Sequence, residues 1–82
     1  MANTMRELEE LAEMISIAIA REQASIEFYN NAYNKAVSEN ARRIFSLLLE
    51  QEKRHEVDLR SQLHELRAEI ESERSKRGKH KG

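Results

Sequence analysis

Cysteine, proline and tryptophan are absent from this 82-residue chain, and its two glycines both lie in the last five residues. Without cysteine the chain can form no disulfide, no thiolate metal site and no thiol nucleophile. Without proline or an internal glycine, nothing in the sequence forces a helix to break, and 35% of the residues are charged. These features predict long, uninterrupted helices and an all-α fold.

The sequence also lacks a long apolar run and an N-terminal targeting segment. A membrane-spanning helix needs about 20 mostly apolar residues, so no membrane insertion is predicted and a cytoplasmic location is expected. The net charge is only −1, but all fifteen acidic residues precede position 74 and the segment 74–82 is basic. No aromatic residue lies among those basic residues, so nucleic-acid recognition is not expected.

Apolar residues recur at intervals of three and four, which is the spacing of one face of an α-helix. One set predicts a helix over about residues 4–37, and a second set predicts a helix over about residues 39–75. The connecting segment NKAVSEN contains residues that favour helix ends, and Ser38 is the expected N-cap of the second helix. The sequence therefore predicts an antiparallel helical hairpin over residues 1–73, followed by a basic, disordered tail over 74–82.

Each apolar stripe is interrupted once, near the middle of its helix. The first stripe consists of Leu8, Leu11, Ile15, Ala18, Glu22, Ser25 and Tyr29. The second consists of Phe45, Leu48, Glu52, His55 and Leu59. Because antiparallel helices rise equally per residue, a turn near residue 38 places Glu22 level with Glu52 and His55. Carboxylates on a core face are costly unless paired or bound to a cation, so these three residues are candidate ligands of a divalent metal ion.

Glu52 and His55 form a Glu-x-x-His pair, which points a carboxylate and an imidazole from one helix face toward one point. Di-iron and di-manganese four-helix bundles take such a pair from each of two helices and one Glu from each of two others. This chain supplies half of that set. A two-fold homodimer would supply all of it and would cover the open face of a hairpin too small to be stable alone. A homodimer is the smallest expected assembly, and apolar positions beside the stripes would allow a larger ring.

The segments REQASIEFYNNA at 21–32 and EQEKRHEVDL at 50–59 resemble the ferritin-like and rubrerythrin superfamily, and the chain length resembles its half-size members, the encapsulated ferritins. The resemblance implies that two hairpins form a ferritin-like four-helix bundle. It also implies a di-iron ferroxidase that oxidises Fe(II) with oxygen for iron storage or detoxification. Glu52 and His55 would hold one iron from each chain, and Glu22 would bridge. An encapsulin shell is a further implied partner and compartment.

Several alternatives stay open at the level of the sequence. Tyr29, seven residues after Glu22, is either a hydrogen-bond partner of a ligand or a core residue with a hydrated hydroxyl. Manganese or zinc could substitute for iron, because carboxylate and imidazole ligands suit all three. The chain could also be a metal-free structural oligomer whose polar core residues set the register. A third function is peroxide reduction at a similar di-iron site, as in rubrerythrins, although this chain lacks their cysteine-bound iron module.

Overall fold

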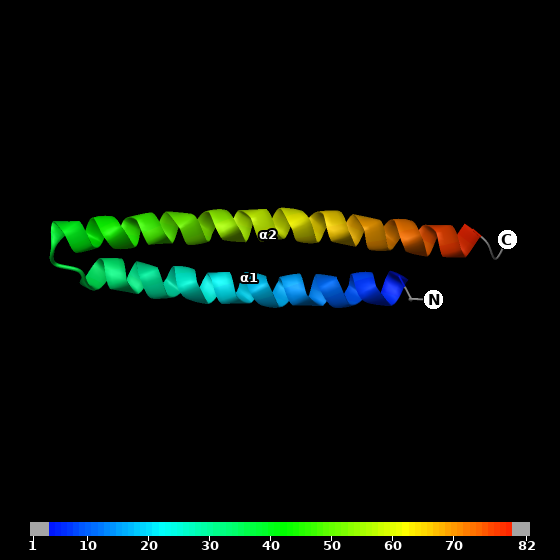
Figure 1. Cartoon of the computed structure of the whole chain (residues 1–82), viewed down its shortest axis with the longest axis horizontal. Helices are drawn as coiled ribbons and strands as arrows, with labels where there is room; N and C mark the ends of the chain where they lie inside the picture. The colour runs from blue at the N-terminus through cyan, green and yellow to red at the C-terminus, as the bar shows by residue number, and fades with distance from the viewer. Residues whose placement is uncertain (1–3, 80–82) are drawn as a thin grey trace.

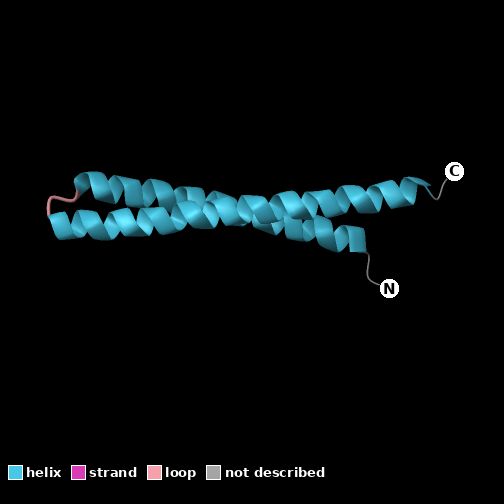
Figure 2. Cartoon of the chain, turned by 90° about the horizontal axis from the view of Figure 1, so that it is seen from above, coloured by secondary structure: helices cyan, strands magenta, loops and turns pink. Residues whose placement is uncertain are grey.

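The computed structural model describes residues 4–79, with side chains through residue 76, as two long helices joined by a short turn (Figure 1). Helix α1 spans Thr4–Lys35 and helix α2 spans Glu39–Lys79. The two helices run antiparallel, and Figure 2 shows them crossing at a shallow angle when seen from above. The structure measures 66 Å by 17 Å by 16 Å. The predicted all-α fold and helical hairpin are confirmed.

The turn occupies residues 36–38 and ends at a capping serine. The Ser38 Oγ accepts a hydrogen bond from the backbone N–H of Ala41 at 3.3 Å. The Ser38 carbonyl oxygen accepts another from the backbone N–H of Arg42 at 3.0 Å. These are the bonds of an N-cap residue, so the predicted cap is confirmed. Helix α1 ends at Lys35 rather than at about residue 37, and no residue in the described part of the chain has a positive φ.

Helix α2 continues to Lys79, past the predicted end near residue 75. The residues from Arg74 onward were expected to be disordered, whereas the structure describes a helix as far as Lys79. Arg74 is held by Glu71 one turn earlier at 3.1 Å and by Glu9 of α1 at 3.2 Å. Ion pairs three or four residues apart each stabilise a helix by a few tenths of a kcal/mol. The rest of the predicted tail, residues 80–82, lies outside the described residues.

The core of the hairpin is narrow, because two helices can cover only one strip of each other's surface. Met5, Leu8 and Ile70 form a buried cluster near the open end, against which Ala12 and Leu66 pack. Ile19 and Leu63 are also buried. Leu11, which the sequence placed on the main stripe, is instead 42% exposed. The line of contact therefore passes to one side of the predicted stripe, and part of that stripe is left on an open face.

Large apolar side chains remain exposed along the whole hairpin. They are Leu11, Met14, Ile17, Phe28, Val37, Ile44, Leu47 and Val57. Where such side chains lie side by side on a surface, they are typical of an interaction site. Neither helix contains a stretch within the described residues that is long and apolar enough to cross a membrane.

Candidate metal centre

The structure brings Glu22 of α1 together with Glu52 and His55 of α2, near the middle of the hairpin. Each of the three offers a ligand atom, and these atoms lie within 4.8 Å of one another. The His55 Nδ1 is 3.5 Å from the Glu22 Oε2 and 3.9 Å from the Glu52 Oε1. Within the described residues, no other group of three or more His, Asp or Glu side chains meets in this way. The hairpin therefore places Glu22 of α1 at the same height as Glu52 and His55 of α2, as the sequence predicted.

Packing on both sides of the centre holds the helices in this register. On the side of the open end, Ile19 is buried one turn before Glu22. On the side of the turn, the rings of Tyr29 and Phe45 lie with their centroids 6.4 Å apart. Apolar contacts on both sides of the centre thus fix the register of the two helices, which brings Glu22 and Glu52 together although they are thirty residues apart in the sequence. The side chains meet because the backbone positions are set by this packing.

The three side chains differ in exposure. The Glu22 and Glu52 side chains are 21% and 19% exposed, whereas that of His55 is 60% exposed. The sequence placed His55 on the core stripe, but in the hairpin it lies at the edge. The Oε2 atom of Glu22 is buried and has no hydrogen-bond partner. A buried oxygen left unsatisfied costs about 1–3 kcal/mol, and more if it is charged, so this atom calls for a partner such as a cation.

The two carboxylates also act on each other's protonation. A hydrogen bond to Glu22, which Glu52 can donate only when protonated, raises the pKa of the Glu52 carboxyl. Partial burial and the negative charge of Glu22 raise the pKa further, while His55 opposes them. The cause is the crowding of two acidic groups at one height, which disfavours the doubly ionised state. A divalent cation would reverse this, because its charge favours both ionised carboxylates.

The separations of the ligand atoms fit a bound divalent ion. Protein nitrogen and carboxylate oxygen bind such ions at about 2.0–2.2 Å, so two ligands of one ion lie at most about 4.4 Å apart. The two His55 distances already satisfy this limit. The longest separation in the group, at most 4.8 Å, needs only a small rotamer adjustment. One imidazole and two carboxylates, with one oxygen lacking any other partner, therefore form a suitable donor set for iron, manganese or zinc.

The chain was compared with known protein families, and the segment that matches one of them includes all three candidate ligands. The family model described as Rubrerythrin matches residues 2–63, which is more than half of the chain. The chain belongs to the rubrerythrin family. This family is part of the ferritin-like superfamily, and the matched segment contains Glu22, Glu52 and His55. No match to the chain was found among curated proteins or among solved structures.

Tyr29 of this rubrerythrin-family chain lies in an aromatic group rather than against the ligands. Its ring meets that of Phe28 edge-on at 5.4 Å and that of Phe45 at 6.4 Å. Within the described residues, no hydrogen bond joins its hydroxyl to the three candidate ligands. In the single hairpin, Tyr29 is thus a packing residue, and the alternative role as a partner of a ligand stays a prediction for the assembled protein.

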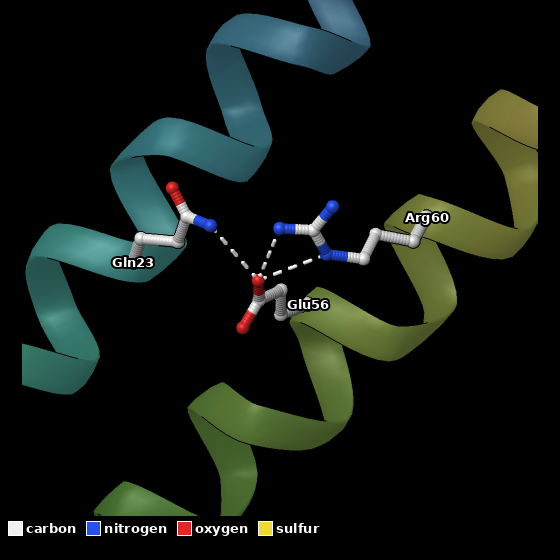
Figure 3. A network of polar contacts seen from close by, with 3 residues as sticks. All are labelled: Gln23, Glu56 and Arg60. Atoms are coloured by element: carbon white, nitrogen blue, oxygen red, sulfur yellow. Dashed lines mark hydrogen bonds and ion pairs between the residues drawn. The ribbon is translucent and has the colours of Figure 1, made fainter.

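A second polar group crosses between the helices one turn away, and sequence reasoning missed it. The Glu56 Oε2 accepts hydrogen bonds from the Gln23 Nε2 at 3.1 Å and from the Arg60 Nε and Nη2 at 2.9 and 2.7 Å (Figure 3). The bonds from Arg60 and then Gln23 lower the pKa of the Glu56 carboxyl. The Glu56-to-Arg60 spacing of four residues was a signal for an ion pair, but nothing in the sequence indicated Gln23. Because this carboxylate is already satisfied, it is a structural link and not a ligand.

Proposed function

We propose that this rubrerythrin-family protein is a ferroxidase, in which Fe(II) is the substrate and oxygen accepts its electrons. The supporting observation is the meeting of Glu22, Glu52 and His55, with one buried Glu22 oxygen that has no hydrogen-bond partner. The same oxygen lies 3.5 Å from the His55 Nδ1, so it faces another candidate ligand, whereas the Glu56 carboxylate is taken up by hydrogen bonds from Gln23 and Arg60.

Each of the three residues has a distinct role in binding. Glu22 would bind from α1, where its Oε2 lies 3.5 Å from the His55 Nδ1 and has no hydrogen-bond partner. Glu52 and His55 bind from α2. Glu52 releases its proton on binding, because a nearby cation lowers the pKa that Glu22 had raised. Iron bound here supplies the redox chemistry, in which each Fe(II) loses one electron.

The proposed centre is shared between two chains. One hairpin contributes two carboxylates and one imidazole, which is half of the ligand set of di-iron bundles. The exposed side chain of His55 lies at the edge of its own hairpin, where a second copy could approach it. Apolar side chains elsewhere on the hairpin, including Leu11 and Ile44, are exposed in the single chain. A two-fold dimer would thus complete the ligand set and bury apolar side chains at the same time.

Anaerobic titration with Fe(II), followed by oxygen, tests the proposal. Wild-type protein should bind about one Fe(II) per chain and oxidise it when oxygen is admitted, as followed by optical absorbance. The double variant Glu52→Ala, His55→Ala should lose both. A matched control is Glu50→Ala, His64→Ala, which removes the same residue types from exposed positions of the same helix. This control should retain binding and oxidation.

Other outcomes would favour the other functions. Equal Fe(II) binding in the double variant and its control would refute the proposed centre. No binding in either protein, with an unchanged oligomer, would indicate a structural helical assembly. Faster oxidation by hydrogen peroxide than by oxygen would indicate a peroxidase at the same site. An encapsulin shell as partner and compartment stays a prediction.

A further inference from the structure

The hydrogen bond between Gln23 and Glu56 lies directly beside the candidate metal centre. Gln23 follows Glu22 on α1, and its Nε2 donates to the Glu56 Oε2 at 3.1 Å (Figure 3). Glu56 follows His55 on α2. The two helices are therefore bonded to each other by the immediate neighbours of two candidate ligands. A restraint that this bond places on the helices also acts on the ligands.

This hydrogen bond and the ligand pair lie on opposite sides of the line along which the helices touch. Consecutive residues of an α-helix point about 100° apart, so His55 and Glu56 flank the row of α2 residues that faces α1. Glu52 belongs to that row, and its side chain is mostly covered. On one side of the row, the His55 Nδ1 is 3.5 Å from the Glu22 Oε2. On the other side, Glu56 accepts the bond from Gln23.

A rotation of α2 about its own axis therefore changes the two contacts in opposite directions. Rotation one way swings His55 outward, away from Glu22, and drives Glu56 against α1. Rotation the other way pulls Glu56 away from Gln23 and breaks their hydrogen bond. Side chains lie about 5–6 Å from the helix axis, so a rotation of about 10° moves them by about 1 Å. Ligands must be held within about 0.5 Å of the productive geometry, so rotations this small already matter.

Apolar packing controls this rotation less well than it controls the register. The buried residues on the side of the open end, Ile19 and Leu63, lie in the narrow strip where the helices touch. Contacts in such a strip oppose sliding and separation, but they lie close to the line about which the helices roll. The bond between Gln23 and Glu56 lies off that line, so it opposes rotation with a longer lever arm.

Arg60 orients the Glu56 carboxylate for this role. The Arg60 Nε and Nη2 donate to the same Oε2 at 2.9 and 2.7 Å, from one turn farther along α2. The carboxylate is therefore held by its own helix, so the bond from Gln23 restrains α2 itself and not only a mobile side chain. Because the acceptor is charged, that bond is also stronger than one between neutral groups.

We infer that Gln23 and Glu56 are positioning residues for the candidate metal centre. Their hydrogen bond fixes the rotation of α2 and so keeps His55 within reach of Glu22. The inference rests on the proposed function in one respect, that the three candidate ligands bind a divalent ion, and it is independent of the reaction that follows. Loss of a hydrogen-bonding residue that positions metal ligands typically weakens metal binding by about 10- to 100-fold.

Titration with Co(II) tests this role, because the visible absorption of the bound ion reports both its binding and its coordination geometry. Glu56→Met removes the acceptor and keeps a good helix-forming side chain. It should weaken Co(II) binding by about 10- to 100-fold and change the spectrum at saturation. Gln23→Met removes the donor of the same bond and should have the same effect. The double variant should lose no more than either single variant, because both changes remove one interaction.

Two controls separate positioning from charge and from overall stability. Glu56→Gln removes the charge but keeps an oxygen that can accept from Gln23, so its Co(II) affinity should stay close to that of wild type. Glu9→Met removes another hydrogen bond between the helices, which Arg74 donates to Glu9 at 3.2 Å, about 20 Å from Glu22 along α1. It should lower the Tm of the metal-free protein and leave the Co(II) affinity unchanged.

The outcomes separate this inference from the proposed function. Equal affinity in wild type and Glu56→Met overturns the inference, and so does an equal loss in Glu56→Gln, because the effect is then one of charge. If circular dichroism shows that Glu56→Met does not fold, Gln23→Met carries the same test. A wild type that binds neither Co(II) nor Fe(II) overturns both the inference and the ferroxidase. Weakened Co(II) binding in the two Met variants, with no oxidation of Fe(II) by oxygen in wild type, supports the inference and refutes the ferroxidase.

Discussion

Replacing Glu52 with Gln should have opposite effects on the metal-free and the metal-bound protein. The change keeps the size of the side chain but removes one of two carboxylate charges whose oxygens lie within 4.8 Å. Two unit charges at this distance repel by about 1 kcal/mol in water-like surroundings, which is a lower limit for these two carboxylates because their side chains are only 21% and 19% exposed. Without metal, the variant should therefore be more stable than wild type by about 1 kcal/mol. For a domain of this size, that gain raises Tm by about 4–8 °C.

With metal the order should reverse. Fe(II) held anaerobically at a hundred times its dissociation constant stabilises the wild-type fold by about 2.7 kcal/mol, which corresponds to a rise in Tm of about 10–20 °C. The variant has lost a charged ligand and should show little of that rise.

Thermal unfolding followed by circular dichroism at pH 8, at one protein concentration, with and without Fe(II), measures both effects. Glu50→Gln is the matched control, since it makes the same change at an exposed position of the same helix; its stability should stay within about 0.5 kcal/mol of wild type. A metal-free variant that is less stable than wild type, or one that keeps the full rise with Fe(II), would refute the reasoning.

Three further expectations follow from the structure. Because the pKa of Glu52 is raised, the contribution of this residue to metal-free stability is fully present below pH 4.5, its ordinary pKa, and is lost as pH rises through the raised pKa. Urea unfolding at several pH values should therefore show that the stability advantage of Glu52→Gln over wild type grows from pH 4 to pH 8. The lowered pKa of Glu56 has the opposite sign, so Glu56→Gln should lower Tm above pH 4.5, lose that effect on acidification and leave Fe(II) binding unchanged. Leu8→Ala, in the buried cluster with Met5 and Ile70, should cost about 2–4 kcal/mol in urea unfolding, and a loss below about 1 kcal/mol would contradict its buried position.

The sequence predicted the helices and the meeting of the ligands for one physical reason. Both depend only on the regular rise and repeat of an α-helix, so the position of the turn determines which residues of the two helices are level. Ser38 could be identified because an N-cap needs a side-chain oxygen, and serine is among the preferred residues at that position. Once the turn was placed, Glu22 had to lie near Glu52 and His55. Its role as a metal ligand stays a prediction.

The errors concern lateral position and local pairing, which periodicity does not determine. Leu11 and Ile19 both fit a helical stripe. The rotation of the helix about its own axis decides which of the two side chains faces the other helix, and Ile19 is the one that is buried. The same rotation leaves His55 at the edge. The end of α2 was missed because Arg74 gains stability from Glu9, a residue of the other helix, and composition alone contains no such contact.

The three-residue turn has a consequence for how copies of this chain can combine. It contains neither Gly nor Pro, and no described residue has a positive φ, so little backbone strain opposes its straightening. A chain straightened there becomes one helix of about 110 Å, and two such chains can exchange their second helices. Domain swapping of this kind rebuilds every contact between α1 and α2, including those of Glu22 with Glu52 and His55. In such an exchanged pair, Glu22 would meet Glu52 and His55 of the other chain instead of its own.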